Sequence, residues 1–138
     1  MGAYVSLPSW VRGIQQRYHL EIGQCVDCGS RSFPPTGACQ SCASHAGYTR
    51  TIPQGTGAVK SVTVVRAAPP PEFAGLLEQI GSIGVVIVTL DEGIDVPGML
   101  TDCDPTTVQI GQRVAMVHRR IYSEEGIVRY GFKFRPIS

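Results

Sequence analysis

The chain has 138 residues, of which 43% are hydrophobic and 17% charged, a balance that excludes a largely disordered chain because disordered sequences are poor in apolar residues. No apolar run approaches the roughly 20 residues that cross a bilayer, and the first residues lack the basic and apolar regions of a secretory signal, so we expect a cytoplasmic protein without a membrane span. The formal net charge of +1 argues against a strong polyanion binder.

The N-terminal segment, residues 1–20, is predicted to form a short amphipathic helix. Pro8 suits a first helical turn, because the backbone N–H at that position has no partner within the helix and its absence in proline costs nothing. Trp10, Ile14 and Tyr18 follow at spacings that place them on one helical stripe. Two interpretations stay open: the helix packs on its own domain, or it docks on a partner protein.

Residues 21–53 contain two cysteine pairs, Cys25-x2-Cys28 and Cys39-x2-Cys42, separated by ten residues. Each Cys-x2-Cys pair places two thiolates on one turn, and a second pair on a neighbouring hairpin completes the tetrahedron that zinc accepts. A disulfide framework would need an oxidising compartment, which nothing in the sequence indicates. We therefore predict a zinc ribbon in which all four ligands come from the protein, so the site is structural rather than catalytic.

The metal is expected to fold this segment, which is too short and too rich in Gly, Pro and Ser to bury a core of its own. Gly29 follows the first pair directly, where a tight turn often needs a positive φ. The same four thiolates also hold iron in rubredoxin-like electron carriers, so iron stays an alternative to the favoured zinc.

Residues 54–138 are predicted to be mainly β and to form a five-stranded OB-like barrel. The candidate strands are rich in β-branched residues and are separated by turns of Gly, Asp and Pro; they cover residues 59–65, 83–90, 96–100, 113–117 and 127–134. The nearly continuous Val/Ile run over 83–90 is typical of a strand buried on both faces. A Pro-rich and helical insertion at 67–82 interrupts the strands.

The groups in this barrel that could do acid–base or nucleophilic chemistry have simpler structural explanations. Asp91 and Asp95 flank one predicted turn, and Asp102 and Asp104 flank another, where Asp is common. Cys103 lies between the last two, and their charges raise the pKa of a thiol rather than lower it. The sequence therefore offers no recognisable set of catalytic residues.

The last predicted strand alternates basic and aromatic side chains. Tyr130, Phe132 and Phe134 share one face, and Arg129, Lys133 and Arg135 share the other. OB-type barrels use such surfaces to stack bases and follow phosphates, so a single-stranded nucleic-acid-binding protein is the alternative function. The favoured interpretation is a half-buried strand whose basic face is solvated.

The order of the motifs resembles one protein family. The first half contains Arg17-Tyr18-His19-Leu20, Cys25-x2-Cys28-Gly29, Phe33-Pro34-Pro35 and Cys39-x2-Cys42, and the second half contains Gly57-x-Val59-x-Ser61, Ala68-Pro69-Pro70, Leu90-Asp91-Glu92-Gly93, Asp104-Pro105 and Phe132-x-Phe134-x-Pro136. Each motif is loose alone, but their order is specific and extends over nearly the whole chain. The sequence is similar to OB-fold, acyl-CoA-associated proteins with an N-terminal rubredoxin-like zinc ribbon, the domain of unknown function 35.

This resemblance implies an N-terminal helix, a ribbon whose four cysteines bind one structural Zn²⁺, and an OB-like barrel. It also implies a non-catalytic accessory subunit that forms a hetero-oligomer with a thiolase-superfamily enzyme. Such a subunit helps to form or stabilise the acyl-CoA site for carbon–carbon bond formation or thiolytic cleavage, with the CoA thioester shared with the partner. The candidate contacts to acyl-CoA or to the partner are Arg17, Tyr18, Phe33, Pro34 and Pro35.

Overall fold

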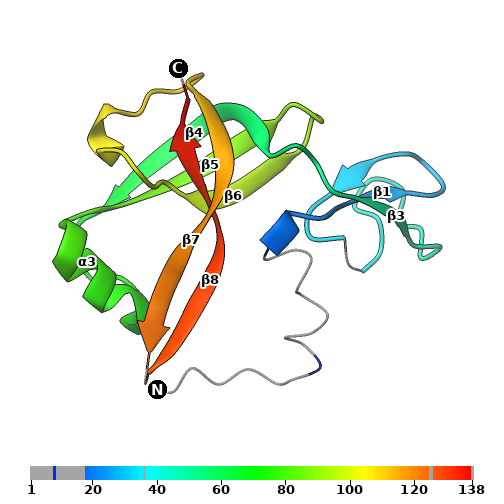
Figure 1. Ribbon diagram of the computed structural model, residues 1–138. Coiled ribbons are helices and arrows are strands. Elements are labelled where there is room, and N and C mark those ends of the chain that lie inside the picture. Colours follow the sequence, from blue (N-terminus) through cyan, green and yellow to red (C-terminus); the bar gives the residue numbers. More distant parts are fainter. Residues whose placement is uncertain (1–7, 9–17, 36, 125, 138) are drawn as a thin grey trace.

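The computed structural model of the chain describes residue 8 and residues 18–35, 37–124 and 126–137, and it contains two antiparallel β-sheets joined side by side (Figure 1). The helix expected over residues 1–20 falls almost entirely outside the described residues. Residues 18 and 19 are helical and lead directly into Leu20, which is fully buried. None of the helices in the described part of the chain is long and apolar enough to cross a lipid bilayer.

The smaller sheet has the strand order β2-β1-β3, formed by β1 (Ile22–Cys25), β2 (Arg31–Ser32) and β3 (Tyr48–Thr51). Gly23 in the central strand allows a very close approach of the neighbouring chain. A Cβ at this position would lie 2.4 Å from the Cβ of Pro35 and 2.9 Å from the Cβ of Tyr48. The sheet therefore packs tightly because its middle strand lacks a side chain at this point.

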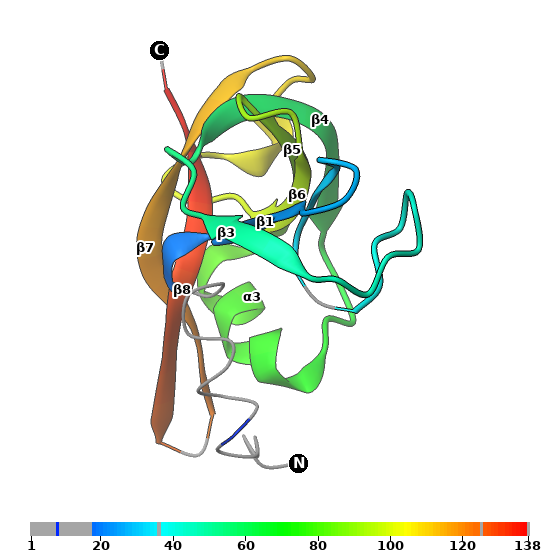
Figure 2. The ribbon, with the colours of Figure 1, turned by 90° about the vertical axis from the view of Figure 1, so that its right-hand side faces the viewer.

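The larger sheet has the order β6-β5-β4-β7-β8 and curls into a barrel (Figures 1 and 2). Its strands are β4 (Thr56–Val65), β5 (Ile83–Leu90), β6 (Asp95–Met99), β7 (Arg113–Glu124) and β8 (Ile127–Pro136). The ends meet where Leu100 forms a parallel bridge with Phe134 and the N–H of Thr101 donates to the Phe134 carbonyl at 2.9 Å. The predicted mainly β fold with a nearly closed five-stranded barrel is thus confirmed.

One hydrophobic core serves both sheets. Its buried members are Leu20, Ile22, Val59, Val86, Val88, Leu90, Ile94, Val96, Leu100, Val108, Val114 and Phe134. Leu20 directly precedes the small sheet and Ile22 belongs to it, yet both are buried in one cluster with residues from all five barrel strands. The two parts of the chain therefore bury apolar surface together rather than separately.

The insertion between β4 and β5 contains a 3₁₀ turn, η1 (Pro71–Phe73), followed by the helix α3 (Ala74–Ile80), as predicted. Gly81 ends the helix with φ of +78°, and its N–H donates to the Leu77 carbonyl at 2.8 Å. Phe73 packs edge-on against Tyr122 with ring centroids 5.4 Å apart, which fastens the insertion to β7. The insertion thus covers part of the outer surface of the barrel.

Two expectations about buried and exposed faces were wrong. The strand β5 is not buried on both faces, because Val85 and Ile87 are 37% and 41% exposed on the outside of the barrel. The basic face of β8 is not uniformly solvated, because Arg135 is exposed whereas Lys133 is only 6% exposed. In both cases the burial of a face depends on which other segments lie beside the strand, and this is not a property of the strand alone.

Candidate metal centre

The first cysteine pair lies on the turn between β1 and β2. The N–H of Gly29 donates to the Cys25 carbonyl at 2.9 Å, and the N–H of Cys25 donates to the Ser30 carbonyl at 2.8 Å. Gly29 has φ of +75°, which confirms the positive φ expected for the residue after the pair. This tight turn, which we call a knuckle, directs the sulfurs of Cys25 and Cys28 to the same side.

The second pair repeats this geometry in the loop between β2 and β3. The N–H of Ala43 donates to the Cys39 carbonyl at 2.8 Å, and the N–H of Cys39 donates to the Ser44 carbonyl at 3.0 Å. Ala43 takes the place of Gly29 and has φ of +60°. No strand flanks this knuckle within the described segment 37–47, so the hairpin that the sequence suggested is absent there. The loop is instead held by its internal hydrogen bonds and by bonds to the first knuckle, such as the one between the hydroxyls of Ser30 and Ser41 at 2.9 Å.

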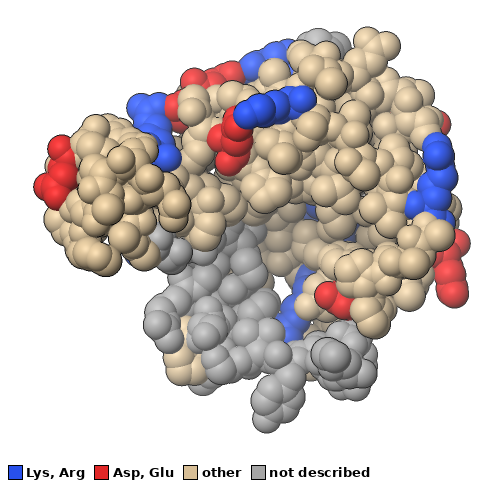
Figure 3. Space-filling model, turned by 180° about the vertical axis from the view of Figure 1, so that it is seen from behind, with Lys and Arg blue, Asp and Glu red and all other residues tan. Residues whose placement is uncertain are grey.

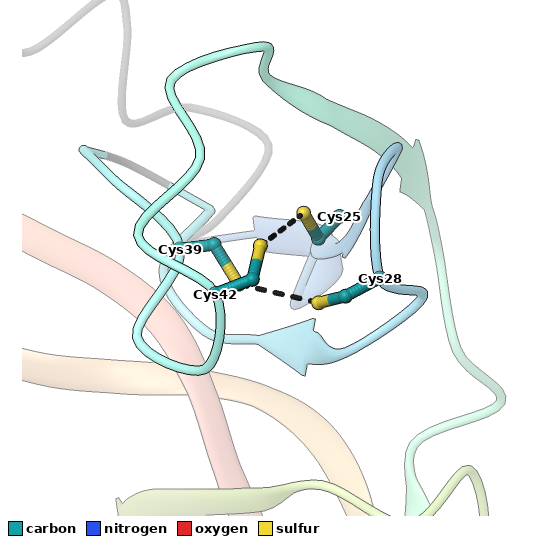
Figure 4. Close-up of side chains that lie close together, drawn as sticks. All are labelled: Cys25, Cys28, Cys39 and Cys42. Carbon is teal, nitrogen blue, oxygen red and sulfur yellow. Dashed lines mark hydrogen bonds between the residues drawn. The ribbon is translucent and has the colours of Figure 1, made fainter.

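The four sulfurs converge on one point (Figure 4). The Sγ atoms of Cys25 and Cys42 are 3.7 Å apart, those of Cys28 and Cys39 are 3.6 Å apart, and all four lie within 4.8 Å of one another. A tetrahedral ion with Zn–S bonds of ~2.3 Å needs sulfur separations of about 3.8 Å, whereas a disulfide needs about 2.05 Å. The donor set and its spacing therefore fit one zinc ion and no disulfide.

The electrostatics of the cluster favour a bound cation. The N–H groups of Cys42 and Ser41 hold the pKa of Cys39 down to about 6. The N–H of Ser44 lowers the pKa of Cys42, but the other three cysteine sulfurs and burial together outweigh this effect and raise the pKa to about 12. Four thiolates so close together repel one another, and a dication removes this cost while making the coordination complete.

The candidate contact residues differ in accessibility, and their contact with acyl-CoA or a partner stays a prediction. Pro34 is exposed, while Pro35 is buried and its carbonyl accepts a hydrogen bond from Arg50 at 3.5 Å. Phe33 packs edge-on against Phe132 at 6.2 Å between centroids. Tyr18 is partly buried, and its carbonyl contacts Nε2 of His118 on β7; Arg17 lies outside the described residues.

The ribbon is also attached to the barrel through Arg31, whose role the sequence did not reveal. Its guanidinium donates to the carbonyl of Glu92 in the turn between β5 and β6. Glu21 and Arg50 form an ion pair at 3.0 Å within the ribbon. These contacts and the shared core give the metal centre a defined position beside the barrel.

The carboxylates considered for catalysis form ion pairs with arginine side chains or stabilise turns. Arg113 donates two hydrogen bonds of 2.7 Å to Asp91 and, together with the Thr56 hydroxyl, lowers the Asp91 pKa to about 2. Asp102 pairs with Arg119 at 2.6 Å. Burial raises the pKa of the Cys103 thiol, and the flanking aspartates raise it further. These groups are therefore poorly suited to activate a nucleophile.

Comparison with known proteins places both parts of the chain in one family. Family models match residues 15–46 ("ChsH2, rubredoxin-like zinc ribbon domain") and residues 50–119 ("ChsH2, C-terminal OB-fold domain"). A protein of Methanothermobacter thermautotrophicus described as a "DUF35 domain-containing scaffold protein" is 35% identical over 91% of this chain and 92% of its own length. A protein of Methanocaldococcus jannaschii with the same description is 34% identical over 94% of this chain and 89% of its own length.

A solved structure supports the same assignment. A chain of the "Ltp2-ChsH2(DUF35) aldolase" superposes with a TM-score of 0.67 at 25% sequence identity, and the match covers 99% of this chain and 98% of that chain. The likeness thus includes the ribbon, the barrel and their arrangement. The chain belongs to the DUF35 family, and it carries the family's zinc ribbon and OB-fold domain in one polypeptide.

Proposed function

We propose that this chain is a non-catalytic accessory subunit that binds a thiolase-superfamily enzyme and helps to form or stabilise its acyl-CoA site. The observation that carries the proposal is a likeness over the full length of the chain. The relatives are described as scaffold proteins, and the structural neighbour belongs to an aldolase that is named for two proteins. A scaffold of this size supplies a surface, and the partner supplies the catalytic residues.

The chemistry of the described residues supports this division of labour. The four thiolates of the metal centre face one another and leave no fifth position for a substrate. Asp91, Asp95 and Asp102 are neutralised by arginine or lysine side chains. Groups that are engaged in this way stabilise the fold, so we assign the reaction to the partner.

An exposed apolar face on the barrel gives the partner a place to bind. Val85 and Ile87 project outward from β5, and a hollow of about 230 Å³ beside them is lined only by apolar atoms, from Val65, Pro69, Pro70, Phe73, Ile83, Val85 and Met99. Apolar patches of this kind mark interaction surfaces. Seen from behind, uncharged residues also predominate on the surface, and most of the charged side chains lie near its edges (Figure 3).

The proposal is tested by purifying the tagged chain from its source and identifying bound proteins by mass spectrometry. We expect a thiolase-superfamily chain to copurify and to need this subunit for full activity with an acyl-CoA substrate. A monodisperse monomer, together with a thiolase chain that is fully active alone, would overturn the proposal.

A matched pair of variants tests the apolar face. The double change Val85→Lys and Ile87→Lys places two charges on it, whereas Val128→Lys places one on a β8 residue of similar exposure, 40%. We expect only the double variant to lose the partner, with little change in the melting temperature of either variant. Unchanged copurification of the double variant would show that the partner binds elsewhere.

The alternative function, binding of single-stranded nucleic acid, needs exposed aromatic side chains on which bases can stack, and most of those on β8 are covered. Phe134 is fully buried, and Phe132 packs against both Phe134 and Phe33. Of the three aromatic side chains on that face of β8, only Tyr130 is largely exposed, at 55%. A salt titration decides the matter, because binding through phosphates weakens steeply with salt, and no binding at low salt would exclude this function.

A further inference from the structure

A second hollow lies away from the metal centre. It has a volume of about 540 Å³ and is bounded by the start and end of the α3 insertion, by the loop that follows β6, and by one residue of β8. This volume falls within the roughly 300–1,000 Å³ typical of small-molecule sites. Its lining combines apolar side chains with two cations, Arg66 and Lys133, and two carboxylates, Asp102 and Asp104.

Lys133 is the unusual member of this lining. The residue is only 6% exposed, and its side chain forms no hydrogen bond or ion pair with the other residues that the structure describes. Burial lowers the pKa of Lys133, the neighbouring charges of Arg120 and Arg119 lower it further, and the charge of Asp102 offsets only part of this lowering. An ammonium in such a largely buried residue is costly without a hydrogen-bond partner, and an anion in the cavity that Lys133 lines would supply one.

The carboxylates of the cavity form no hydrogen bond or ion pair with this ammonium, because other groups of the described chain engage them. Asp102 is held by Arg119 at 2.6 Å, and Asp104 accepts hydrogen bonds from the N–H and hydroxyl of Thr106 at 2.9 and 2.7 Å. Arg66 lines the same cavity, and no side-chain hydrogen bond links it to the rest of the described chain. The ammonium of Lys133 and the guanidinium of Arg66 therefore both have hydrogen-bond donors available for a ligand in this cavity.

The remaining walls are apolar. Leu76 and Ile80 come from α3, and Leu100 and Pro105 come from the loop beyond β6. A ligand that fits this lining has one anionic head and a short aliphatic body. A dianion such as phosphate fits less well, because Asp102 and Asp104 would repel its second charge.

We propose that this cavity binds a small aliphatic monocarboxylate, whose carboxylate pairs with Lys133 and Arg66 and whose chain packs against Leu76 and Leu100. Charge-assisted hydrogen bonds to an ammonium and a guanidinium are the strong kind. The site is separate from the apolar hollow beside β5 and from the four cysteines, and the proposal does not rest on the accessory-subunit function.

Isothermal titration of the full zinc-loaded chain tests the proposal, with hexanoate, inorganic phosphate and 1-hexanol as separate probes. We expect saturable binding of hexanoate only. Lys133→Met should weaken this binding by about tenfold or more, since a hydrogen bond to a charged group is lost. Arg66→Gln should weaken it as well, and Arg135→Met, on an exposed neighbour in β8, should leave it unchanged.

The melting temperature without ligand separates this role from a structural one. Lys133→Met keeps the length of the side chain but removes the charge that burial penalises, so we expect a higher melting temperature. Retained hexanoate affinity in both Lys133→Met and Arg66→Gln would overturn the proposal, as would stronger binding of phosphate than of hexanoate. Equal binding of 1-hexanol would show an apolar site that does not recognise the carboxylate, which also overturns it.

Discussion

Ala43 occupies the position in the second knuckle that Gly29 occupies in the first. Both residues donate their N–H to the carbonyl of the first cysteine of the pair, and both have a positive φ. For an L-residue with a Cβ, the left-handed region costs about 1–2 kcal/mol. The second knuckle therefore carries backbone strain that the first avoids.

Replacing Ala43 by glycine should relieve this strain. After allowing for the greater freedom of glycine in the unfolded chain, we expect the free energy of unfolding to rise by about 0.5–1 kcal/mol. Denaturant unfolding of the zinc-loaded protein measures the change. Ala46→Gly is the control, because Ala46 lies in the same loop without a positive φ, and a gain as large in Ala46→Gly would contradict the explanation.

Asp91 makes stability depend on pH at the acid end. Its pKa is lowered from 3.8 to about 2 in the folded chain, mainly by hydrogen bonds from Arg113 and then by Thr56. A depressed carboxyl pKa contributes stability above about pH 4, and that contribution disappears as the pH falls through about 2.

The variant Asp91→Asn cannot titrate, so its free energy of unfolding should fall less steeply than that of the unmodified protein between about pH 4 and about pH 2. Acid release of the metal affects both proteins equally, and the difference between the two curves isolates Asp91. Parallel curves over this range would show that the ion pair with Arg113 does not contribute.

At the scale of elements, the β4–β5 pairing depends on a glycine. A Cβ on Gly57 would lie 2.4 Å from the Thr89 carbonyl oxygen and 2.9 Å from the Cα of Leu90, both of them backbone atoms of β5. Backbone cannot move aside as a flexible side chain can. Gly57 therefore has to be glycine for the two strands to approach in this register.

Gly57→Ala should lower the free energy of unfolding by about 1–3 kcal/mol, the usual cost of overpacking. Gly75→Ala is a matched control that should change the free energy of unfolding in the opposite direction. Gly75 lies in α3, and a Cβ added there would meet no atom within 4 Å. There alanine should stabilise by about 0.5–1 kcal/mol. Thermal unfolding of both variants measures whether stability falls in Gly57→Ala and rises in Gly75→Ala. Unchanged stability in Gly57→Ala would exclude the steric argument.

For the whole molecule, the shared core couples the metal centre to the barrel. Leu20 and Ile22 precede the first knuckle in the chain and are buried together with Val88, Val96 and other barrel residues. Unfolding of the ribbon exposes this apolar surface, so the effect of losing the metal should extend beyond the ribbon.

Cys39→Ser should release the zinc ion, unfold the ribbon and abolish assembly with the partner. We also expect it to lower the melting temperature of the barrel, because part of the core is lost with Leu20 and Ile22. Elemental analysis, calorimetry and copurification measure the three effects. Cys103→Ser is the control, because Cys103 lies outside the four-sulfur cluster; an unchanged melting curve in Cys39→Ser would show that the site is dispensable.

The same preparation separates zinc from iron. A colourless protein with one zinc per chain excludes a rubredoxin-like electron carrier, because iron bound by four thiolates absorbs visible light and changes its oxidation state, whereas zinc does not. A coloured protein that contains iron would instead assign the four cysteines to electron transfer.

The sequence by itself determined what depends on short separations along the chain. The Cys-x2-Cys spacing predicted which sulfurs lie together, Gly29 predicted a left-handed turn, and the Val/Ile run predicted β5 with the bounds that it has. Each of these depends on local backbone geometry, which neighbouring residues set. The ordered motifs along the chain indicated the family for the same reason.

Only the tertiary structure decided which faces are covered. Alternation placed Lys133 beside Arg135 on a solvated face, yet Lys133 is only 6% exposed and lines a hollow together with residues of α3 and of the loop after β6. An unbroken apolar run indicated that β5 is buried on both sides, yet Val85 and Ile87 are exposed. Burial depends on which distant segments pack over a strand, and barrel closure between Leu100 and Phe134 sets that arrangement through contacts that no local pattern encodes.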